Sequence, residues 1–195
     1  MDAANVPVDI PNWLLNRFDA LYLQPPHYEA SYYGPINMLL TTFFTSQKGF
    51  LVKPQARLRD PPSPGGRTSS DSYGQTVGTS DKDGNPDFLV STATSMLHCD
   101  VPFLIYEIKR DDQDEILASR QMDRYINWAR EYQRHVSPWA RVGVYAVLVL
   151  GSKSIVYDLS PNSNFINAEP YLDTTGPQIL NMLNNLCHGP HGHGV

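Results

Sequence analysis

Apolar residues recur along the chain with two periods, one typical of helices and one typical of strands. Helical spacing predicts four helices, over residues 11–23, 27–47, 113–134 and 177–187. Alternating or continuous apolar runs predict five strands, over residues 50–59, 86–92, 102–109, 142–150 and 155–159. This order of elements predicts an α/β sandwich around a mixed sheet.

The same spacings predict which side chains share a face. The helix over 11–23 has an apolar side formed by Trp13, Leu14, Phe18 and Leu21. The helix over 113–134 places a second set on one face: Leu117, Gln121, Tyr125, Trp128 and Tyr132. Strand alternation places Phe103, Ile105, Glu107 and Lys109 together. Pro35, inside the second predicted helix, predicts a kink or a reset of its start.

Composition divides the chain into one domain with appended ends. Residues 60–85 are rich in Pro, Gly and Ser, which predicts a mobile loop. Residues 188–195 are rich in His and Gly and predict a flexible tail. We therefore expect an N-terminal extension with a helix over 1–24, an α/β domain over 25–187, and the tail.

Two predicted strands carry ionisable groups where a core strand should not have them. Asp87 follows Pro86 at the start of one strand, and Glu107-Ile108-Lys109 ends the next. Burying these charges without partners would be costly. If the strands pair as a hairpin, the two carboxylates meet at one end of the sheet, where their oxygens suit Mg²⁺ or Mn²⁺. A lysine beside such a site can orient water or stabilise charge on a phosphate.

A structural interpretation stands beside this one. Glu-x-Lys is common on solvated strand faces, where the two residues form an ion pair. The apolar run Phe-Leu-Ile-Tyr before Glu107, and a second acidic residue one strand earlier, favour a functional site instead.

Pro86-Asp87 and Glu107-Ile108-Lys109 resemble the motif of the PD-(D/E)XK nuclease superfamily. The core of that family, helix–strand–strand–strand–helix–strand, matches about residues 27–151. The resemblance implies a restriction-endonuclease-like sandwich, a central mixed sheet flanked by helices. It also implies that Asp87, Glu107 and the backbone carbonyl of Ile108 bind Mg²⁺ or Mn²⁺ and that Lys109 is catalytic.

Further positions match the same family. Gln121 and Tyr125, one helical turn apart, resemble a Gln-x-x-x-Tyr of its exonuclease branch that lies near metal and nucleic acid. The bland alternatives are a surface glutamine and a core tyrosine. Glu29 is a candidate for the extra acidic ligand that many members carry, with a solvated glutamate as the equal alternative. The stretch from Glu29 to Asn37 also resembles nuclease-like domains of fungal proteins.

Basic residues offer candidate phosphate contacts. Arg110 and Arg120 lie near the motif, and an ordinary mixed surface is nearly as good an interpretation of them. The formal net charge is −5, which argues against a broadly basic nucleic-acid coat but leaves room for a local groove.

The cysteines and the apolar runs indicate the cellular compartment of the protein. Two cysteines, Cys99 and Cys187, do not form a disulfide framework and fit a reducing compartment. No apolar run approaches the length of a membrane span, and no secretory signal is visible at the start of the chain. We expect an intracellular protein, in the cytoplasm or the nucleus, with no membrane partner.

These observations predict a metal-dependent nuclease that acts on DNA more readily than on RNA. The rival is a catalytically idle module of the same fold that binds a protein or nucleic acid, and a protein partner or homodimer is a further expectation. A third alternative is activity on another phosphate ester. The acidic net charge and the absence of an evident DNA-reading element favour the idle module, whereas the intact Asp87, Glu107 and Lys109 favour the enzyme.

Overall fold

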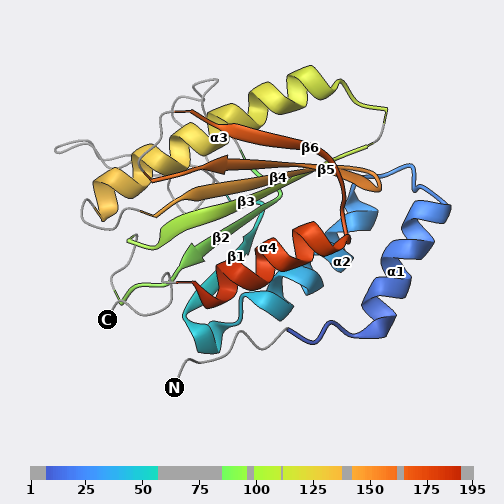
Figure 1. The fold of residues 1–195 in the computed structure, drawn as a ribbon, viewed down its shortest axis with the longest axis horizontal. Helices are drawn as coiled ribbons and strands as arrows, with labels where there is room; N and C mark the ends of the chain where they lie inside the picture. Colours follow the sequence, from blue (N-terminus) through green and yellow to red (C-terminus); the bar gives the residue numbers. More distant parts are fainter. Residues whose placement is uncertain are drawn as a thin grey trace, which may run out of the picture.

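The computed structural model describes residues 8–56, 85–95, 99–110, 112–137, 142–161 and 165–189. Helices and strands follow one another as shown in Figure 1: α1 (Asn12–Leu23), α2 (Ala30–Phe43), the 3₁₀ turn η1 (Ser46–Lys48), β1 (Phe50–Pro54), β2 (Phe88–Thr92), β3 (Val101–Lys109), α3 (Glu115–Val136), β4 (Val144–Leu150), β5 (Lys153–Leu159), β6 (Asn167–Asp173) and α4 (Pro177–His188). The predicted α/β class, with a mixed sheet flanked by helices, is confirmed.

The described residues form a sheet of six strands in sequential order, from β1 at one edge to β6 at the other. Only β3 and β4 are parallel, and α3 connects them. All other neighbours are antiparallel, so the sheet consists of two three-stranded meanders joined by one crossover. The two edge strands each contain a proline, Pro54 in β1 and Pro170 in β6, as expected for strands with one unpaired side.

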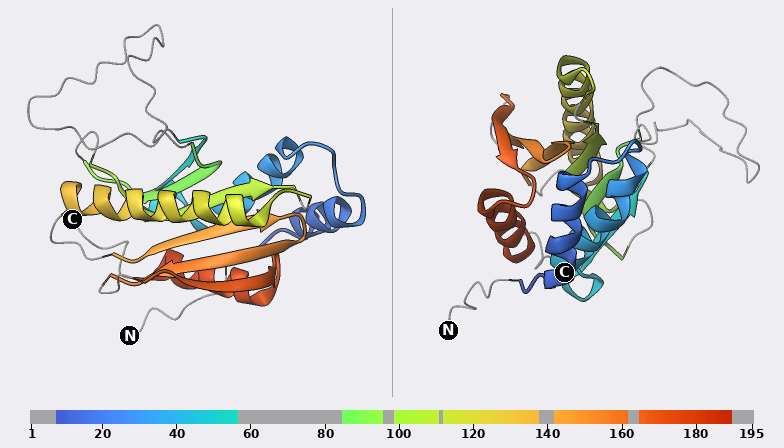
Figure 2. Two further views of the ribbon diagram at one scale, coloured as in Figure 1. Left: turned by 90° about the horizontal axis from the view of Figure 1, so that it is seen from above. Right: turned by 90° about the vertical axis from the view of Figure 1, so that its right-hand side faces the viewer.

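Helices cover both faces of the sheet (Figures 1 and 2). Helix α3 packs on one face, and α1, α2 and α4 pack on the other. The α3 cluster joins the sheet to buried residues of that helix: Ala118, Met122, Tyr125, Ile126 and Ala129. The opposite cluster, which we call the α1/α2/α4 cluster, includes Leu14 and Phe18 of α1, Ile36, Leu39 and Phe43 of α2, and Ile179 and Leu183 of α4. Burial of these apolar side chains is the main favourable contribution to folding.

Two predicted helix faces are wrong in part. Trp13 is 56% exposed, although Leu14, Phe18 and Leu21 are buried as expected. Leu117 is 60% exposed, because the buried stripe of α3 runs one position later, through Ala118, Met122, Ile126 and Ala129. The side chain of Asp114 accepts hydrogen bonds from the N–H groups of Ile116 and Leu117, which fixes the start of α3 and hence this stripe.

The predicted common face of β3 is also wrong at one residue. The pairing of β2 with β3 shifts between Val90 and Ser91, which leaves Phe103 as an extra residue. Phe103 therefore packs against Phe44 and Phe50, on the side opposite α3. Ile105, after the irregularity, lies in the α3 cluster.

Several element boundaries differ from the prediction. Helix α2 begins at Ala30 rather than at residue 27, with Pro35 buried inside it. Strand β1 ends at Pro54, because Gln55 turns with a φ of +46°. Strand β6 is absent from the prediction, since Pro170 and two acidic residues interrupt its alternation. The predicted loop over 60–85, except its last residue, and the tail beyond residue 189 lie outside the described residues.

Among the described residues, no helix is both long and apolar enough to cross a membrane. Cys99 and Cys187 are free cysteines, and Cys187 is buried. Helix α4 ends at His188 with Gly189 as its C-cap, which confirms the predicted end of the last helix.

Candidate acidic site where β2 begins and β3 ends

The antiparallel pairing of β2 and β3 brings Asp87 and Glu107 together. Phe88 pairs with Tyr106, so the residue before β2 lies beside the end of β3. The Ile108 N–H donates to Asp87 Oδ2 at 2.7 Å, and the Asp87 N–H donates to Glu107 Oε2 at 3.2 Å. Each carboxylate is therefore held by the backbone of the other's strand, as the hairpin prediction required.

Both carboxylates are almost withdrawn from water. Asp87 is 8% exposed and Glu107 is 2% exposed. Burial raises the pKa of Glu107 from 4.5 to about 7, with a contribution from the charge of Asp87 and an opposing one from Lys109. Glu107 is thus a carboxyl group that gains or loses its proton near neutral pH.

Lys109 completes this constellation. Its Nζ donates to Glu107 Oε1 at 2.7 Å, and its side chain is largely buried. Burial lowers the pKa of Lys109, but the hydrogen bond and charge of Glu107 outweigh that effect and leave the pKa above its ordinary value. The lysine therefore stays an ammonium that is held in place by one carboxylate.

Tyr33 is a site residue that the sequence did not reveal. Its hydroxyl donates to Asp87 Oδ1 at 2.5 Å, and its ring packs edge-on against Phe88 at 5.9 Å. Burial and the hydrogen bond to Asp87 raise the pKa of Tyr33, so the tyrosine remains a hydrogen-bond donor. The signal for it was the i,i+4 spacing between Glu29 and Tyr33, which places both on one face of a helix.

Glu29 lies close to the site without joining the carboxylates. It occupies the N-cap position of α2 and is half-buried. Its charge contributes to the raised pKa values of Tyr33 and Lys109, which shows its proximity. Within the described ranges no group of three or more His, Cys, Asp or Glu residues could hold a metal ion, so Glu29 does not complete a three-acid cage.

Helix α3 brings one predicted pair over the site. Tyr125 is buried, and Gln121 donates from Nε2 to the Tyr125 hydroxyl at 2.5 Å. Burial and the negative charge of Glu107 raise the pKa of Tyr125, which places this tyrosine near the carboxylates. The face of α3 that carries Gln121 and Tyr125 therefore borders the acidic site.

The two candidate arginines are not drawn into the site. Arg110 forms an ion pair with Asp112. Arg120 is exposed on α3. In the part of the chain that the structure describes, neither forms an ion pair with Asp87 or Glu107. Their predicted phosphate contacts would have to come from an exposed position.

The donor set fits a divalent cation that keeps much of its water. All four oxygens of Asp87 and Glu107 accept a hydrogen bond, from Tyr33, Ile108, Lys109 and the Asp87 N–H. A carboxylate oxygen has two lone pairs, so acceptor capacity remains on each. Mg²⁺ commonly binds through one or two carboxylates and completes its shell with water and substrate phosphate. The site suits that mode better than a closed protein cage.

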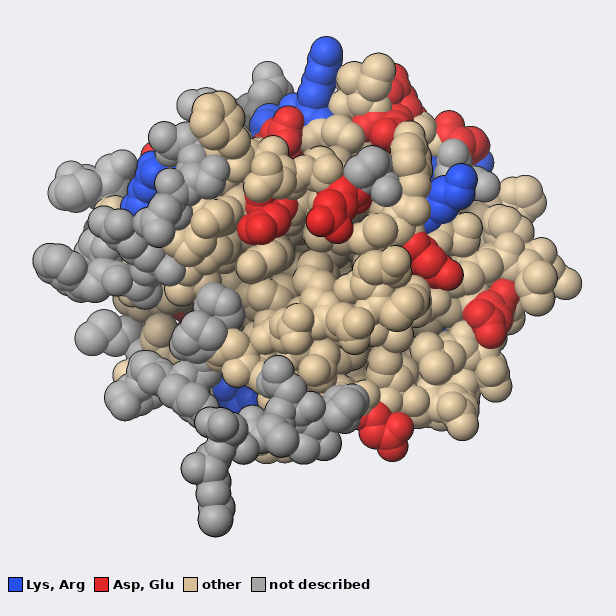
Figure 3. All heavy atoms as spheres, viewed as in Figure 1, with Lys and Arg blue, Asp and Glu red and all other residues tan. Residues whose placement is uncertain are grey.

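A comparison with models of known protein families found none that matches this chain, and a search of curated proteins found no significant relative. On the face shown in Figure 3, acidic side chains are scattered among uncharged ones, and blue side chains are few. This surface agrees with the net charge of −5.

Proposed function

We propose that the chain is a metal-dependent nuclease of the PD-(D/E)XK type, with a restriction-endonuclease-like domain. The observation that carries the proposal is the contact among Asp87, Glu107 and Lys109 at one end of β2 and β3. The sheet supports it as well, because three antiparallel strands are followed by a helix and a parallel fourth strand. This is the element order that the family motif implies.

Each residue has a role that its contacts suggest. A bound Mg²⁺ or Mn²⁺ would supply Lewis acidity toward a phosphate and lower the pKa of a water molecule. Asp87 and Glu107 are the side chains that would hold it, with the carbonyl of Ile108 beside them. Tyr33 fixes the orientation of Asp87 through its hydroxyl. Lys109, held by Glu107, presents a positive charge that can stabilise a developing negative charge on a phosphate oxygen.

The substrate would approach between α3 and the strand ends. Gln121 and Tyr125 border the carboxylates from α3, and Arg120 lies exposed on the same helix. We propose nucleic acid as the substrate, DNA before RNA, in the cytoplasm or the nucleus. Glu29 would act on the charge of Lys109 rather than as a primary metal ligand.

A second candidate is an idle module of the same fold. It is favoured because each of the four carboxylate oxygens already accepts one protein hydrogen bond. A metal would have to share or displace these donors. In that case the acidic group stabilises the β2–β3 pair, and the domain binds a protein or nucleic acid without cleaving it.

Titration with Mn²⁺ and a degradation assay distinguish the two candidates. We expect wild-type protein to bind Mn²⁺ and to degrade single- or double-stranded DNA only when the metal is present. Asp87→Asn should lose both properties, whereas Asp123→Asn, an exposed acid on α3, should keep them. Metal binding without degradation of DNA or RNA would favour the idle module, and equal, negligible heats for wild type and Asp87→Asn would remove the metal site.

A further inference from the structure

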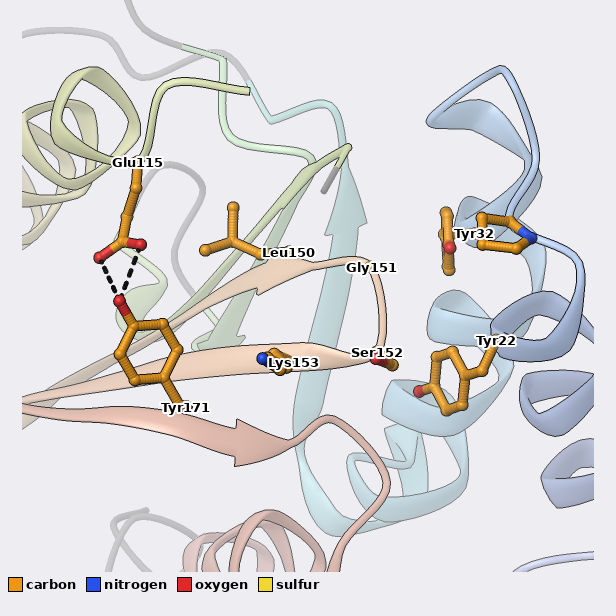
Figure 4. Close-up of a pocket in the computed structure, with 9 residues that line it drawn as sticks. Tyr22, Tyr32, Glu115, Leu150, Gly151, Ser152, Lys153 and Tyr171 are labelled. Atoms are coloured by element: carbon orange, nitrogen blue, oxygen red, sulfur yellow. Dashed lines mark hydrogen bonds between the residues drawn. The ribbon is translucent and has the colours of Figure 1, made fainter. Parts of the chain in front are cut away.

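A cavity of about 320 Å³ lies at the turn where β4 ends and β5 begins, next to the last residue of β3. Its size is at the lower end of the range for small-molecule pockets, about 300–1,000 Å³. Figure 4 shows its walls, which include Tyr22, Tyr32, Glu115, Leu150, Lys153 and Tyr171. Glu115 and Tyr171 form one end, Tyr22 and Tyr32 the other, and the turn from Leu150 to Lys153 lies between them.

The strand register connects this cavity to the acidic site. Lys109 of β3 pairs with Leu150 of β4, and Leu150 pairs with Lys153 of β5. Paired residues on neighbouring strands project from the same face. Since strands lie about 4.8 Å apart, the Cα atoms of Lys153 and Lys109 lie roughly 10 Å apart across the sheet. Two ammonium groups therefore lie on the α3 face within reach of neighbouring phosphates of one nucleic-acid strand.

Tyr171 is held at the rim of the cavity in an unusual conformation. Its φ is +60°, a region that bulky side chains rarely adopt, and its side chain is 58% exposed. Its hydroxyl donates to Glu115 Oε2 at 3.1 Å, and Lys153 Nζ lies 5.8 Å from the centre of its ring. Backbone strain of this kind concentrates at binding sites. The contacts fix an aromatic ring in solvent beside a cation.

The opposite wall carries an unsatisfied polar group. The Tyr22 hydroxyl is buried and makes no hydrogen bond of normal geometry among the described residues, although the side chains of Thr174 and Thr175 lie close to it. In Figure 4 it points toward Ser152, across the cavity from Tyr171. A buried hydroxyl without a partner is commonly satisfied by a water molecule or a ligand. The cavity therefore combines the exposed ring of Tyr171 and the cation of Lys153 with a tyrosine hydroxyl on the opposite wall.

We infer that this cavity, which we call the nucleotide pocket, binds the unpaired base of a nucleotide next to the scissile phosphate, with the base on Tyr171 and its phosphate on Lys153. The inference rests on the proposed nuclease function. A base inside a duplex is stacked and paired, so it cannot enter such a pocket without being unpaired. Aromatic rings beside cations are the usual means of binding single strands without sequence preference. The substrate class is therefore nucleic acid with an unpaired end or single-stranded stretch.

Binding without metal tests the nucleotide pocket separately from catalysis. The full chain in EDTA is titrated into a fluorescein-labelled ten-nucleotide single strand and into a blunt hairpin of matched composition. AMP and ribose 5-phosphate serve as competitors, because only AMP carries a base. We expect the single strand to bind more tightly than the hairpin, and AMP to compete better than ribose 5-phosphate.

Variants then assign the binding to named residues. Tyr171→Ala should weaken single-strand binding about tenfold or more. Tyr171→Phe keeps the ring and should retain most of the affinity. Trp13→Ala, an equally exposed aromatic on α1, should bind as wild type. Lys153→Ala should reduce the slope of log affinity against log salt by about 0.7, the expected loss for one phosphate contact on a single strand.

The outcomes separate the two proposals. Equal binding of hairpin and single strand, or equal effects of Tyr171→Ala and Trp13→Ala, would overturn the nucleotide pocket even if Mn²⁺-dependent cleavage is present. Metal-free binding that depends on Tyr171, in a protein that cleaves nothing, would support the nucleotide pocket and refute the nuclease. If Tyr171→Ala does not fold, an unchanged salt slope in Lys153→Ala overturns the proposal on its own.

Discussion

The two faces of β3 carry different chemistry although they belong to one strand. Leu104, Tyr106 and Ile108 point into the α1/α2/α4 cluster and are fully buried among apolar side chains. On the α3 face, Ile105 is followed by Glu107 and Lys109, which are buried as an ion pair. The face toward the α1/α2/α4 cluster stabilises the fold through apolar burial. The end of the α3 face buries charged groups, which stabilises the fold less.

This difference between the two faces of β3 points to a functional role for the buried charges. A buried ion pair seldom stabilises a protein more than apolar residues of the same shape would. Glu107, with its pKa raised to about 7, is a clear case, because burial destabilises its ionised form.

Truncation on the apolar face should affect stability alone. Leu104→Ala should lower the free energy of unfolding by about 2–5 kcal/mol, since it removes buried methyl groups and leaves a cavity. Urea unfolding followed by circular dichroism measures this loss. Mn²⁺ affinity of the folded protein should not change, and a weaker affinity would mean that the two faces are not independent.

Removal of the ammonium on the other face should affect activity alone. Lys109→Met keeps the apolar stem of the side chain and removes its charge. Cleavage of DNA in Mn²⁺ should fall about 10²-fold or more, equivalent to about 2.7 kcal/mol of transition-state stabilisation. Thermal stability should be nearly unchanged. Full activity in this variant would exclude a catalytic role for Lys109.

Replacement of the buried carboxylate should change how stability depends on pH. The pKa of Glu107 is higher in the folded state, about 7, than its ordinary value of 4.5. With respect to this group, the folded wild-type protein is therefore most stable below pH 4.5, and it loses stability as the pH rises through 7. A rise of this size corresponds to about 3–4 kcal/mol at most, at about 1.4 kcal/mol per pH unit. Glu107→Gln cannot ionise and should not show this loss. Lys109 loses its partner in the variant, which reduces the gain to about 1–3 kcal/mol above pH 7.

Urea unfolding at pH 4, 5.5, 7 and 8 measures both curves. The difference between variant and wild type should increase between pH 4.5 and 7 and then level off. A constant difference across this range would show that Glu107 titrates as an ordinary glutamate.

The smallest effect is expected at Tyr33. Tyr33→Phe removes the hydrogen bond to Asp87 but keeps the ring packed on Phe88. Unfolding free energy should fall by about 1 kcal/mol, the usual value of one hydrogen bond. Tyr28→Phe, in an exposed tyrosine five residues earlier, is the matched control and should show no change. Equal effects of the two changes would mean that the Asp87 contact contributes nothing.

The sequence was sufficient to predict the centre of the site because the site is formed by a local rule. Antiparallel pairing of two consecutive strands places the start of one beside the end of the next, so Asp87 and Glu107 meet once the hairpin forms. Gln121 and Tyr125 could be predicted to share a face for a similar reason, the helical period. Strand alternation also placed Lys109 on the same face as Glu107.

Features that depend on packing between distant elements could not be predicted. Tyr33 reaches Asp87 only because α2 packs against the start of β2, a relation between residues 54 positions apart. Phe103 lies on the other face because the pairing of β2 with β3 shifts by one residue. No residue in the sequence of β3 indicates this shift. The nucleotide pocket takes its walls from α1, α3 and the β4–β6 meander, which no local pattern connects. β6 has too little alternation to be recognised as a strand.

The prolines at the two edges of the sheet bear on how copies of this protein can meet. A proline has no N–H to offer to an incoming strand, and edge strands that contain one are poor templates for further β-pairing. Pro54 and Pro170 are placed on the outermost strands, β1 and β6. Joining two copies through a continuous sheet, or stacking many of them into fibrils, is therefore disfavoured at both ends. We therefore expect any homodimer of this chain to use its helical faces rather than its sheet edges.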